Sequence, residues 1–450
     1  MSARAEGGFT FLKLDTFVGR LAMGLAAVVS SAMASVEAQS LPVTDDCTAA
    51  PPALLDHASA WRRLDRCNRD LIASRRAVEA AAADLRVAGQ SPNPTIAGGV
   101  GSVSPSAGIG PGPLKNKAVD TSVRVEQLIE RGGKLSLRRR TAEQLLEAAE
   151  LDMIEVRRLQ GAAMLVALVD VAAARERVAL LTEVTQLYAE GSRASAQRLA
   201  RGDVARIDVQ RQAIDALRAQ ADLRQAQADV ERGRLGLASL LGWERFASSL
   251  EPAAFVLQSV SEVAPESQPD ERRADVRAAR RRVDAALTAR DLARAQTHAD
   301  VTVGVQFDHY PQNGNNTNGS GNTFSLSASI PLLVRHRFQG EIAKAQNDYY
   351  AAEETLHRVI ANAQSDWARL SADLAAALAR FRLLQDEVAP QTEAVAQAAE
   401  IGYAKGALSV LDVLDARRTA RQSRLDLLAA RADVARANAM REAWLRSEQQ

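Results

Sequence analysis

Two aspartates near the C-terminus, Asp412 and Asp415, have a spacing that could form a charged constriction. Residues three apart lie on the same face of a helix. If a three-fold assembly brought one such helix from each chain to a common axis, six carboxylates would crowd one level of a tube. Rings of carboxylates favour cations, which offset the repulsion between the like charges. The other interpretation, two aspartates on a solvated helix face, stays open.

The first half of the chain offers a weaker version of this pair. Asp208 occupies the equivalent place, but the residue three positions further on is Arg211. We therefore expect only the C-terminal half to contribute a doubled ring.

No other group of side chains has a spacing suited to catalysis or to metal binding. The five histidines show no paired ligand spacing, and neither Cys47 nor Cys67 has a Cys-x-x-Cys partner. The phosphate-binding, dinucleotide-binding and nucleophile-elbow motifs are missing from the sequence. We therefore expect no enzyme activity, no catalytic residue, no metal site and no cofactor. Whether the two cysteines form a disulfide is left open.

The composition favours long helices. Charged residues make up 25% of the 450 residues, yet the formal net charge is +1, which leaves no basic footprint for a nucleic-acid partner. Aromatic residues are only 4%, whereas alanine, arginine and leucine are abundant. Such a composition suits closely packed helices better than an enzyme core.

The N-terminus has the pattern of an export signal. Positive charge at Lys13 and Arg20 is followed by an apolar stretch and by small residues suited to cleavage after Ala34, with a second site at Ala38. We assign residues 1–34 to a signal peptide and 35–53 to an N-terminal linker. The apolar stretch is shorter than the roughly 20 residues that a membrane-spanning helix needs, and we expect no such helix in the mature protein.

The remainder of the chain is an internal duplication. Gly202 and Gly406 each follow a small and a basic residue, and each precedes an Asp-Val pair six positions later, at Asp208 and Asp412. We divide the chain into a first repeat at 54–242, a connecting segment at 243–268 and a second repeat at 269–447. The glycines predict tight turns between long antiparallel helices.

Each repeat contains two predicted strands. Apolar and polar residues alternate within four segments, at about 94–103, 119–127, 300–310 and 322–331. A length of about ten residues is that of a tilted strand crossing an outer membrane. Four strands are too few to close a barrel. If these strands face lipid, several chains must therefore contribute strands to one common barrel. A small soluble sheet packed on helices is the alternative.

Very long helices follow the strand pairs. Residues 137–200 contain no proline and residues 340–402 contain only Pro390, and helices of this length would span roughly 90–95 Å. A row of mostly small residues at spacings of three and four marks the returning helix of the second repeat: Val413, Ala416, Ala420, Ser423, Leu427, Ala430, Val434 and Ala437. A second row lies beside it, so this helix could pack against neighbours on two sides; its members are Leu425, Leu428, Ala432, Ala435 and Ala439. The pattern predicts a helical tube.

Duplicated strand pairs and long helical hairpins behind a signal peptide resemble the TolC family of outer-membrane efflux proteins. The resemblance implies a mainly α fold with a small β part, a homotrimer with a twelve-stranded barrel in outer-membrane lipid, and a helical barrel in the periplasm. It implies a passive exit duct that works with a periplasmic adaptor protein and a proton-driven inner-membrane pump. It places adaptor docking at the tip turns with Gly202, Asp208, Gly406 and Leu408, and the pore constriction at Asp412 and Asp415.

Two stretches, 126–139 and 330–345, resemble the heavy-metal branch of this family, and so imply heavy-metal cations as cargo and a role in resistance to them. The chain departs from the family at Leu408, where a basic latch residue is usual, and at Gln268, where an arginine is usual. A periplasmic coiled-coil scaffold without a pore is the alternative function.

Overall fold

The structure is a computed structural model that describes residues 45–103, 119–202, 204–252, 272–311 and 321–446. Residues Met1–Asp46 and Cys47–Gln450 form separate units, and the description below concerns the second. The signal peptide and most of the linker lie outside the described residues, as do Gln268 and the polar loop between the second pair of strands. The elements of the first half are η1 (Asp45–Thr48), α2 (His57–Cys67), α3 (Arg69–Ala88), β1 (Thr95–Gly101), β2 (Asp120–Ile129), α4 (Lys134–Ala200), α5 (Arg206–Leu241) and η3 (Glu244–Ser249). Those of the second half are α6 (Ala274–Ala295), β3 (Val301–Tyr310), β4 (Gly321–Ser329), α7 (Gln339–Leu383), η4 (Leu384–Val388), α8 (Ala389–Ala404) and α9 (Val410–Arg446).

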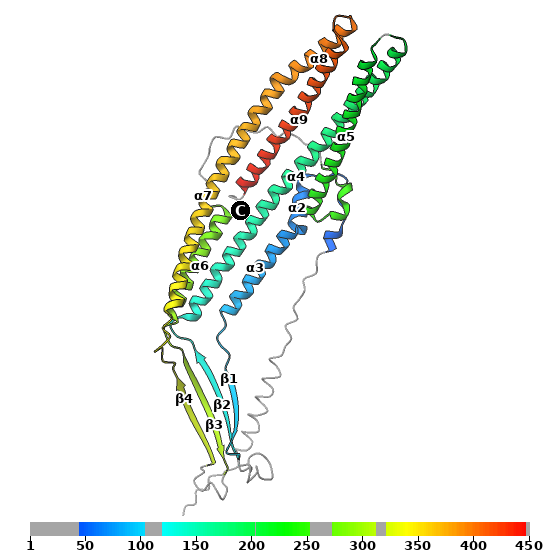
Figure 1. Ribbon diagram of the computed structural model, residues 1–450. Coiled ribbons are helices and arrows are strands. Elements are labelled where there is room, and N and C mark those ends of the chain that lie inside the picture. The colour runs from blue at the N-terminus through cyan, green and yellow to red at the C-terminus, as the bar shows by residue number, and fades with distance from the viewer. Residues whose placement is uncertain (1–44, 104–118, 203, 253–271, 312–320, 447–450) are drawn as a thin grey trace, which may run out of the picture. The chain divides into compact units, whose positions relative to one another are not determined.

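Long helical hairpins make up most of the molecule (Figure 1). Helix α4 has 67 residues, which corresponds to a length of about 100 Å. It returns through α5, and the second repeat has the same arrangement in α7, α8 and α9. The mainly helical fold with four strands that the sequence predicts is confirmed.

The predicted second long helix is interrupted. A π-helical segment, Leu384–Val388, separates α7 from α8, and Pro390 follows it in the first turn of α8. Proline has no N–H, so an α-helix through this point would leave a carbonyl of the preceding turn without its partner. A π-helical turn changes the hydrogen-bond spacing locally and lets the helix continue past the proline.

The row of small residues on α9 packs against neighbouring helices. Every member from Val413 to Ala437 is buried, except Leu427, which is half-buried. Near the tip, Val413 and Ala416 pack against Ala396 and Ala399 of α8. Further along, Ala432 and Ala435 of the second row pack against α4. Small side chains on both sides let α9 lie close to two helices at once, as the sequence predicts.

The four strands form one antiparallel sheet in the order β1-β2-β3-β4. The central pair joins the two repeats, with Val125 opposite Val305. Strand β2 leads directly into α4, and α6 leads into β3, so the sheet is attached to the helices of both repeats. At this junction the Lys134 ammonium lies 2.8 Å from a carboxylate oxygen of Asp300, which fixes the start of α4 to the start of β3.

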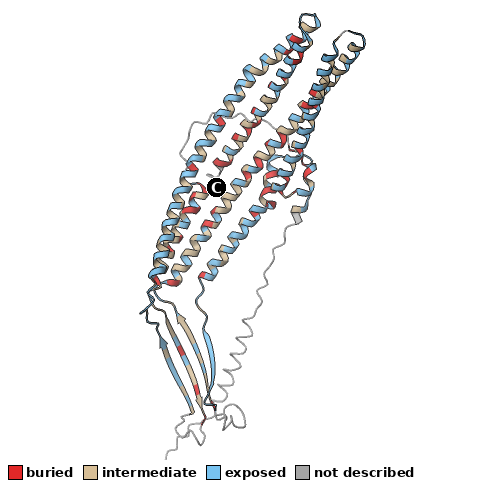
Figure 2. Ribbon diagram, in the orientation of Figure 1, coloured by how far each residue is buried: buried red, intermediate tan, exposed pale blue. Residues whose placement is uncertain are grey.

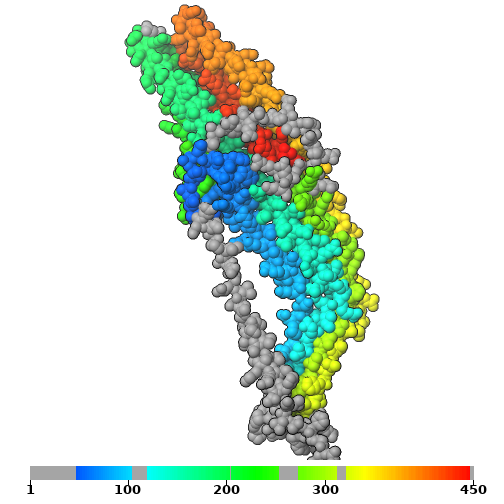
Figure 3. Space-filling view, turned by 180° about the vertical axis from the view of Figure 1, so that it is seen from behind, coloured from blue at the N-terminus to red at the C-terminus, as the bar shows by residue number. Residues whose placement is uncertain are grey.

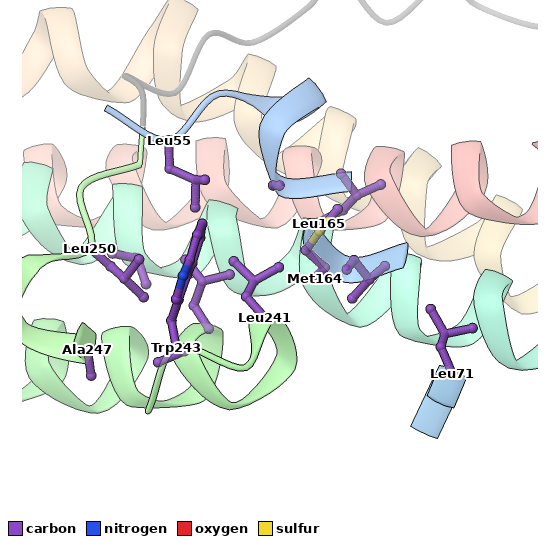
Figure 4. Close-up of a cluster of buried hydrophobic side chains, with 13 residues drawn as sticks. Leu55, Leu71, Met164, Leu165, Leu241, Trp243, Ala247 and Leu250 are labelled. Carbon is purple, nitrogen blue, oxygen red and sulfur yellow. The ribbon is translucent and has the colours of Figure 1, made fainter. Parts of the chain in front are cut away.

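The largest core lies midway along the helices, where α2, α4, α5 and η3 meet (Figure 4). Trp243 and Leu250 lie in it together with Met164 of α4. The close approach of α2 to α4 depends on Gly161, because a Cβ atom there would lie 2.0 Å from the ring of Trp61. This core fixes the segment after α5 against the first helical hairpin.

A disulfide joins Cys47 to Cys67, which answers the question that the sequence left open. The N-terminal segment is also held by Arg63, whose side chain donates to the carbonyl of Cys47 and to that of Leu241, at 3.0 Å for the latter. The guanidinium of Arg63 lies 4.5 Å from the ring centroid of Trp243. The disulfide and Arg63 therefore hold the residues before α2 against the C-terminal end of α5.

Candidate functional site

The two helical hairpins end side by side, at the ends of α4 and α8 (Figure 3). The turns contain Gly202 with φ of 83° and Gly406 with φ of 77°, both in the left-handed region that glycine tolerates. Among the described residues, and apart from the immediate chain neighbours, no atom lies within 4 Å of a Cβ built at either position. The need for glycine is therefore conformational and does not come from lack of space.

The second tip turn is a complete Schellman motif. The N–H of Gly406 donates to the carbonyl of Tyr403, and the N–H of Ala407 donates to that of Gly402 at 2.8 Å. Leu408 then folds back onto the last turn of α8, because a Cβ at Gly402 would lie 2.8 Å from Leu408 Cδ1. The Leu408 side chain thus packs on its own hairpin, and the residue stays 40% exposed.

Asp412 closes the start of α9 in a capping box with Ser409. Its carboxylate accepts from the Ser409 N–H at 2.9 Å and from the Ser409 hydroxyl at 2.8 Å. In return, the Asp412 N–H donates to the Ser409 hydroxyl. The hydroxyl and the backbone N–H of Ser409 hold the pKa of Asp412 below its usual value. The Ser-x-x-Asp pattern was visible in the sequence, but sequence reasoning did not use it.

Asp415 lies one turn further along α9 and is exposed, as is Asp412. Between them, Val413 and Leu414 are buried, so the two carboxylates share the outer side of the helix. The first tip differs, because Asp208 forms an ion pair with Arg211 at 3.6 Å. The structure therefore brings two unneutralised carboxylates together in the second hairpin and an acid–base pair in the first.

Polar side chains connect the two hairpins near their tips. Arg198 of α4 donates to the hydroxyl of Tyr403 of α8 at 2.6 Å. Further from the tip, Arg418 of α9 donates to Asp215 of α5, also at 2.6 Å. Both contacts join residues more than 200 positions apart. The tip of one repeat is therefore fastened to the tip of the other, and sequence reasoning missed both links.

The sheet is apolar on the face that is open to the surroundings. Val123 and Val125 of β2, Val305 of β3, and Phe324 and Leu326 of β4 all lie on this face and are exposed. Phe324 and Leu326 keep 78% and 84% of their surface exposed. A water-soluble sheet buries its apolar face, so this arrangement is the reverse of the usual one.

The opposite face of the sheet is polar and carries the buried residues of the strands, Gly304 and Asp308 of β3. Figure 2 colours the buried positions red. Arg124 is paired with Glu126 and donates to the Ser327 hydroxyl at 3.2 Å. Asp308 is buried and accepts from Gln306. A sheet that exposes aliphatic groups outside and pairs charges inside has the character of a barrel wall in lipid.

The described part of the chain holds no group of three or more histidine, cysteine, aspartate or glutamate side chains close enough to bind one metal ion. Within the same residues, no helix combines the length and the apolarity needed to cross a membrane.

The family described as "Outer membrane efflux protein" matches residues 63–243 and 267–443, which is most of the chain. The chain belongs to the outer membrane efflux protein family. This efflux protein is 28% identical over 317 residues to the "Cobalt-zinc-cadmium resistance protein CzcC" of Cupriavidus metallidurans, with 67% of this chain and 71% of that protein covered.

Two solved outer-membrane proteins have the same fold as the efflux protein. The outer-membrane channel OprN superposes with a TM-score of 0.73 at 22% identity, covering 86% of this chain and 89% of the other. The outer membrane protein VceC of Vibrio cholerae superposes with a TM-score of 0.72 at 20% identity, covering 86% and 95%. The predicted family and the predicted outer-membrane efflux channel are thereby confirmed.

Proposed function

We propose that three copies of the chain pool their sheets into a twelve-stranded barrel in the outer membrane. The observation that carries this proposal is the inverted sheet, whose apolar face is exposed and whose polar face is covered. Among the described residues, β1 pairs only with β2 and β4 only with β3, so both outer strands have an unpaired edge. Lipid does not tolerate unpaired edges, and pairing β1 of one chain with β4 of the next removes them.

In this assembly the long helices form a duct in the periplasm, and the protein acts in transport without catalysing a reaction. The duct is the passive exit of a tripartite system with an inner-membrane, proton-driven pump and a periplasmic adaptor. We place adaptor docking at the tip turns that contain Gly202, Asp208, Gly406 and Leu408. The open space around both glycines supports this placement.

The constriction in this proposal is formed by Asp412 and Asp415 of three α9 helices. Both side chains are exposed in the single chain and lie beside the second tip turn. Asp412 keeps its ionised form through the capping box, so it would supply negative charge at the entrance. Such a ring admits cations more readily than anions.

Heavy-metal cations are the proposed cargo. The support is the 28% identity to a relative named for cobalt, zinc and cadmium resistance. Deletion of the gene from its host should lower resistance to these metals and leave resistance to unrelated drugs unchanged. Unchanged metal resistance together with lowered drug resistance would show that the duct exports another class of solute.

Crosslinking of edge strands tests the assembly. Val100→Cys in β1 and Phe324→Cys in β4 place one thiol on each outer strand, while both native cysteines are engaged in their disulfide. In outer membranes, a bifunctional maleimide should trap species of up to three subunits and none larger. The matched control is Val123→Cys with Val305→Cys, on the two central strands, which should give no crosslinks between chains.

Two further measurements separate a duct from a periplasmic scaffold without a pore. The purified protein should require detergent for extraction and should conduct ions in a planar bilayer. Release from membranes by salt alone, as a well-behaved monomer in water, would overturn the proposal and favour the scaffold.

A further inference from the structure

The connection between β4 and α7 continues the apolar face of the sheet beyond the last strand. Alternate residues stay apolar and exposed past the end of β4, at Ile330, Leu332 and Val334. Leu332 is 84% exposed and Val334 is 68% exposed, which is more than most aliphatic side chains of the described residues. The row therefore projects from the sheet toward the helices, and no described part of the chain covers it.

Basic residues follow this row immediately. The N–H of Val334 donates to the carbonyl of Leu332 at 2.9 Å, which turns the chain, and Arg335, His336 and Arg337 come next, all exposed. His336 is engaged, because its Nε2 lies 2.9 Å from a carboxylate oxygen of Glu341. Within the described ranges, neither Arg335 nor Arg337 has a hydrogen bond or an ion pair.

The corresponding connection of the first repeat is built differently. After Ile129 the chain passes directly to Glu130 and has no exposed aliphatic extension. Arg138 is held by two hydrogen bonds to Glu130, at 2.7 and 3.1 Å, and Arg139 pairs with Glu143 at 2.9 Å. Arg138 and Arg139 thus have protein partners, whereas Arg335 and Arg337 have none among the described residues.

We propose that residues 330–337 anchor the protein in the periplasmic leaflet of the outer membrane by binding anionic phospholipid. Leu332 and Val334 enter the acyl layer as an extension of the lipid-facing sheet, and Arg335 and Arg337 bind the lipid phosphates just above it. A guanidinium can make two parallel hydrogen bonds to one phosphate, and an arginine stem reaches readily from apolar surface to the headgroup level. This inference rests on the proposed function, because it requires that the apolar face of the sheet meets lipid.

The test is native mass spectrometry of the full-length protein in detergent, titrated with phosphatidylglycerol or with phosphatidylcholine. The wild type should bind phosphatidylglycerol more tightly. Arg335→Gln combined with Arg337→Gln should weaken that binding by about fivefold for each arginine, the equivalent of ~1 kcal/mol per charge, and leave phosphatidylcholine unaffected. Arg139→Gln, which removes an arginine of the first repeat that is paired with Glu143, should change neither affinity.

Two further arms identify the source of the phosphate and the role of the aliphatic residues. Inorganic phosphate at the same concentration should not displace phosphatidylglycerol, whereas complete displacement would show a free-phosphate site and overturn the lipid proposal. Leu332→Ser combined with Val334→Ser should weaken both lipids alike. Unchanged binding of both lipids would overturn the anchoring role.

Failure of this inference can be told apart from failure of the barrel proposal. If the wild type floats with phosphatidylcholine vesicles but the double arginine variant binds phosphatidylglycerol as tightly as the wild type, only the lipid-binding loop is overturned. If the wild type inserts into no vesicle, the sheet does not meet lipid and both proposals fall together.

Discussion

The guanidinium of Arg418 lies 2.6 Å from a carboxylate oxygen of Asp215, and this ion pair joins α9 of the second repeat to α5 of the first. The side chain of Asp215 is only 6% exposed, whereas that of Arg418 is 45% exposed. The buried carboxylate depends on a partner from the other hairpin for its charge compensation. The pair therefore links the two hairpins beyond what their apolar contacts provide.

Arg418→Gln should destabilise the protein, because it leaves the carboxylate of Asp215 buried without its counter-charge. We expect a loss of about 1–2 kcal/mol, less than for a fully buried pair, since solvent reaches the arginine. Adding Asp215→Asn should restore part of the loss. Thermal unfolding in detergent measures this, and Arg369→Gln, from an exposed pair within α7, should stay within about 0.5 kcal/mol of the wild type. Equal losses for both arginines would contradict the special role of Asp215.

Replacement of the tip glycines should act through backbone strain. Gly202→Ala and Gly406→Ala require a positive φ from an L-residue with a side chain, at a cost of about 1 kcal/mol each. Valine at the same positions should cost more and should impair binding of the adaptor while membrane insertion persists. Gly236→Ala is the control, because that glycine lies inside α5 with no neighbour and should gain up to about 1 kcal/mol. Normal efflux and normal adaptor binding in both valine variants would refute the assignment of the tips.

The proposed carboxylate ring predicts cation selectivity and block by multivalent cations from the periplasmic side. Asp412→Ala combined with Asp415→Ala should reduce selectivity and block together in a planar bilayer, with the barrel still inserted. The resemblance implies a basic latch residue where this chain has Leu408, so we predict that the wild type also shows basal conductance. Wild-type selectivity in the double variant would show that these aspartates face away from the pore.

The capping box adds a pH dependence to that experiment. Because Ser409 lowers the pKa of Asp412, the carboxylate stays ionised to a lower pH than usual, and its share of the block should be lost as the pH falls through the lowered pKa. Ser409→Ala removes the hydroxyl and should shift the loss of block to higher pH. A midpoint that does not move would mean that Asp412 does not contribute to the block.

The junction between sheet and helices should be sensitive to acid. Burial of the Asp300 carboxyl raises its pKa, but hydrogen bonds from Lys134 and from the Arg131 N–H outweigh this, so the pKa lies below its usual value. The stabilisation is therefore present above about pH 4, the usual pKa, and is lost as the pH falls through the lowered pKa. Lys134→Met should cost about 1 kcal/mol at pH 7, and the difference from wild type should shrink below about pH 4. A difference that is constant with pH would exclude the ion pair as its cause.

Local patterns were enough to predict the elements of the fold. The alternation of Val301, Val303, Val305 and Phe307 with polar residues indicated a strand with one apolar face, and spacings of three and four indicated the buried row of α9. These signals are strong because each depends only on the geometry of one strand or one helix. The family resemblance then supplied the arrangement of the elements.

Contacts between distant segments could not be predicted in this way. Arg418 and Asp215 belong to different repeats, and each looks like an ordinary solvated helix residue in the sequence. The π-helical segment before Pro390 and the pairing of Cys47 with Cys67 likewise depend on how the chain is accommodated in three dimensions. The sequence places the basic residues 335–337 directly after a predicted strand, at the expected edge of the membrane, but the exposure of Leu332 and the lack of a partner for Arg335 among the described residues depend on the folded structure.

The Cys47–Cys67 disulfide has a consequence for the order in which the protein is assembled. Its two cysteines are 20 residues apart, with α2 between them, so the covalent loop can close once this short N-terminal stretch has entered an oxidising compartment. The closed loop contacts the carbonyl of Leu241 and the ring of Trp243. Both residues are synthesised much later than the loop. The disulfide-closed loop can therefore form before the end of α5, which it binds, has been synthesised. In a host compartment that keeps thiols reduced, this loop would still be open when residues 241–243 are synthesised.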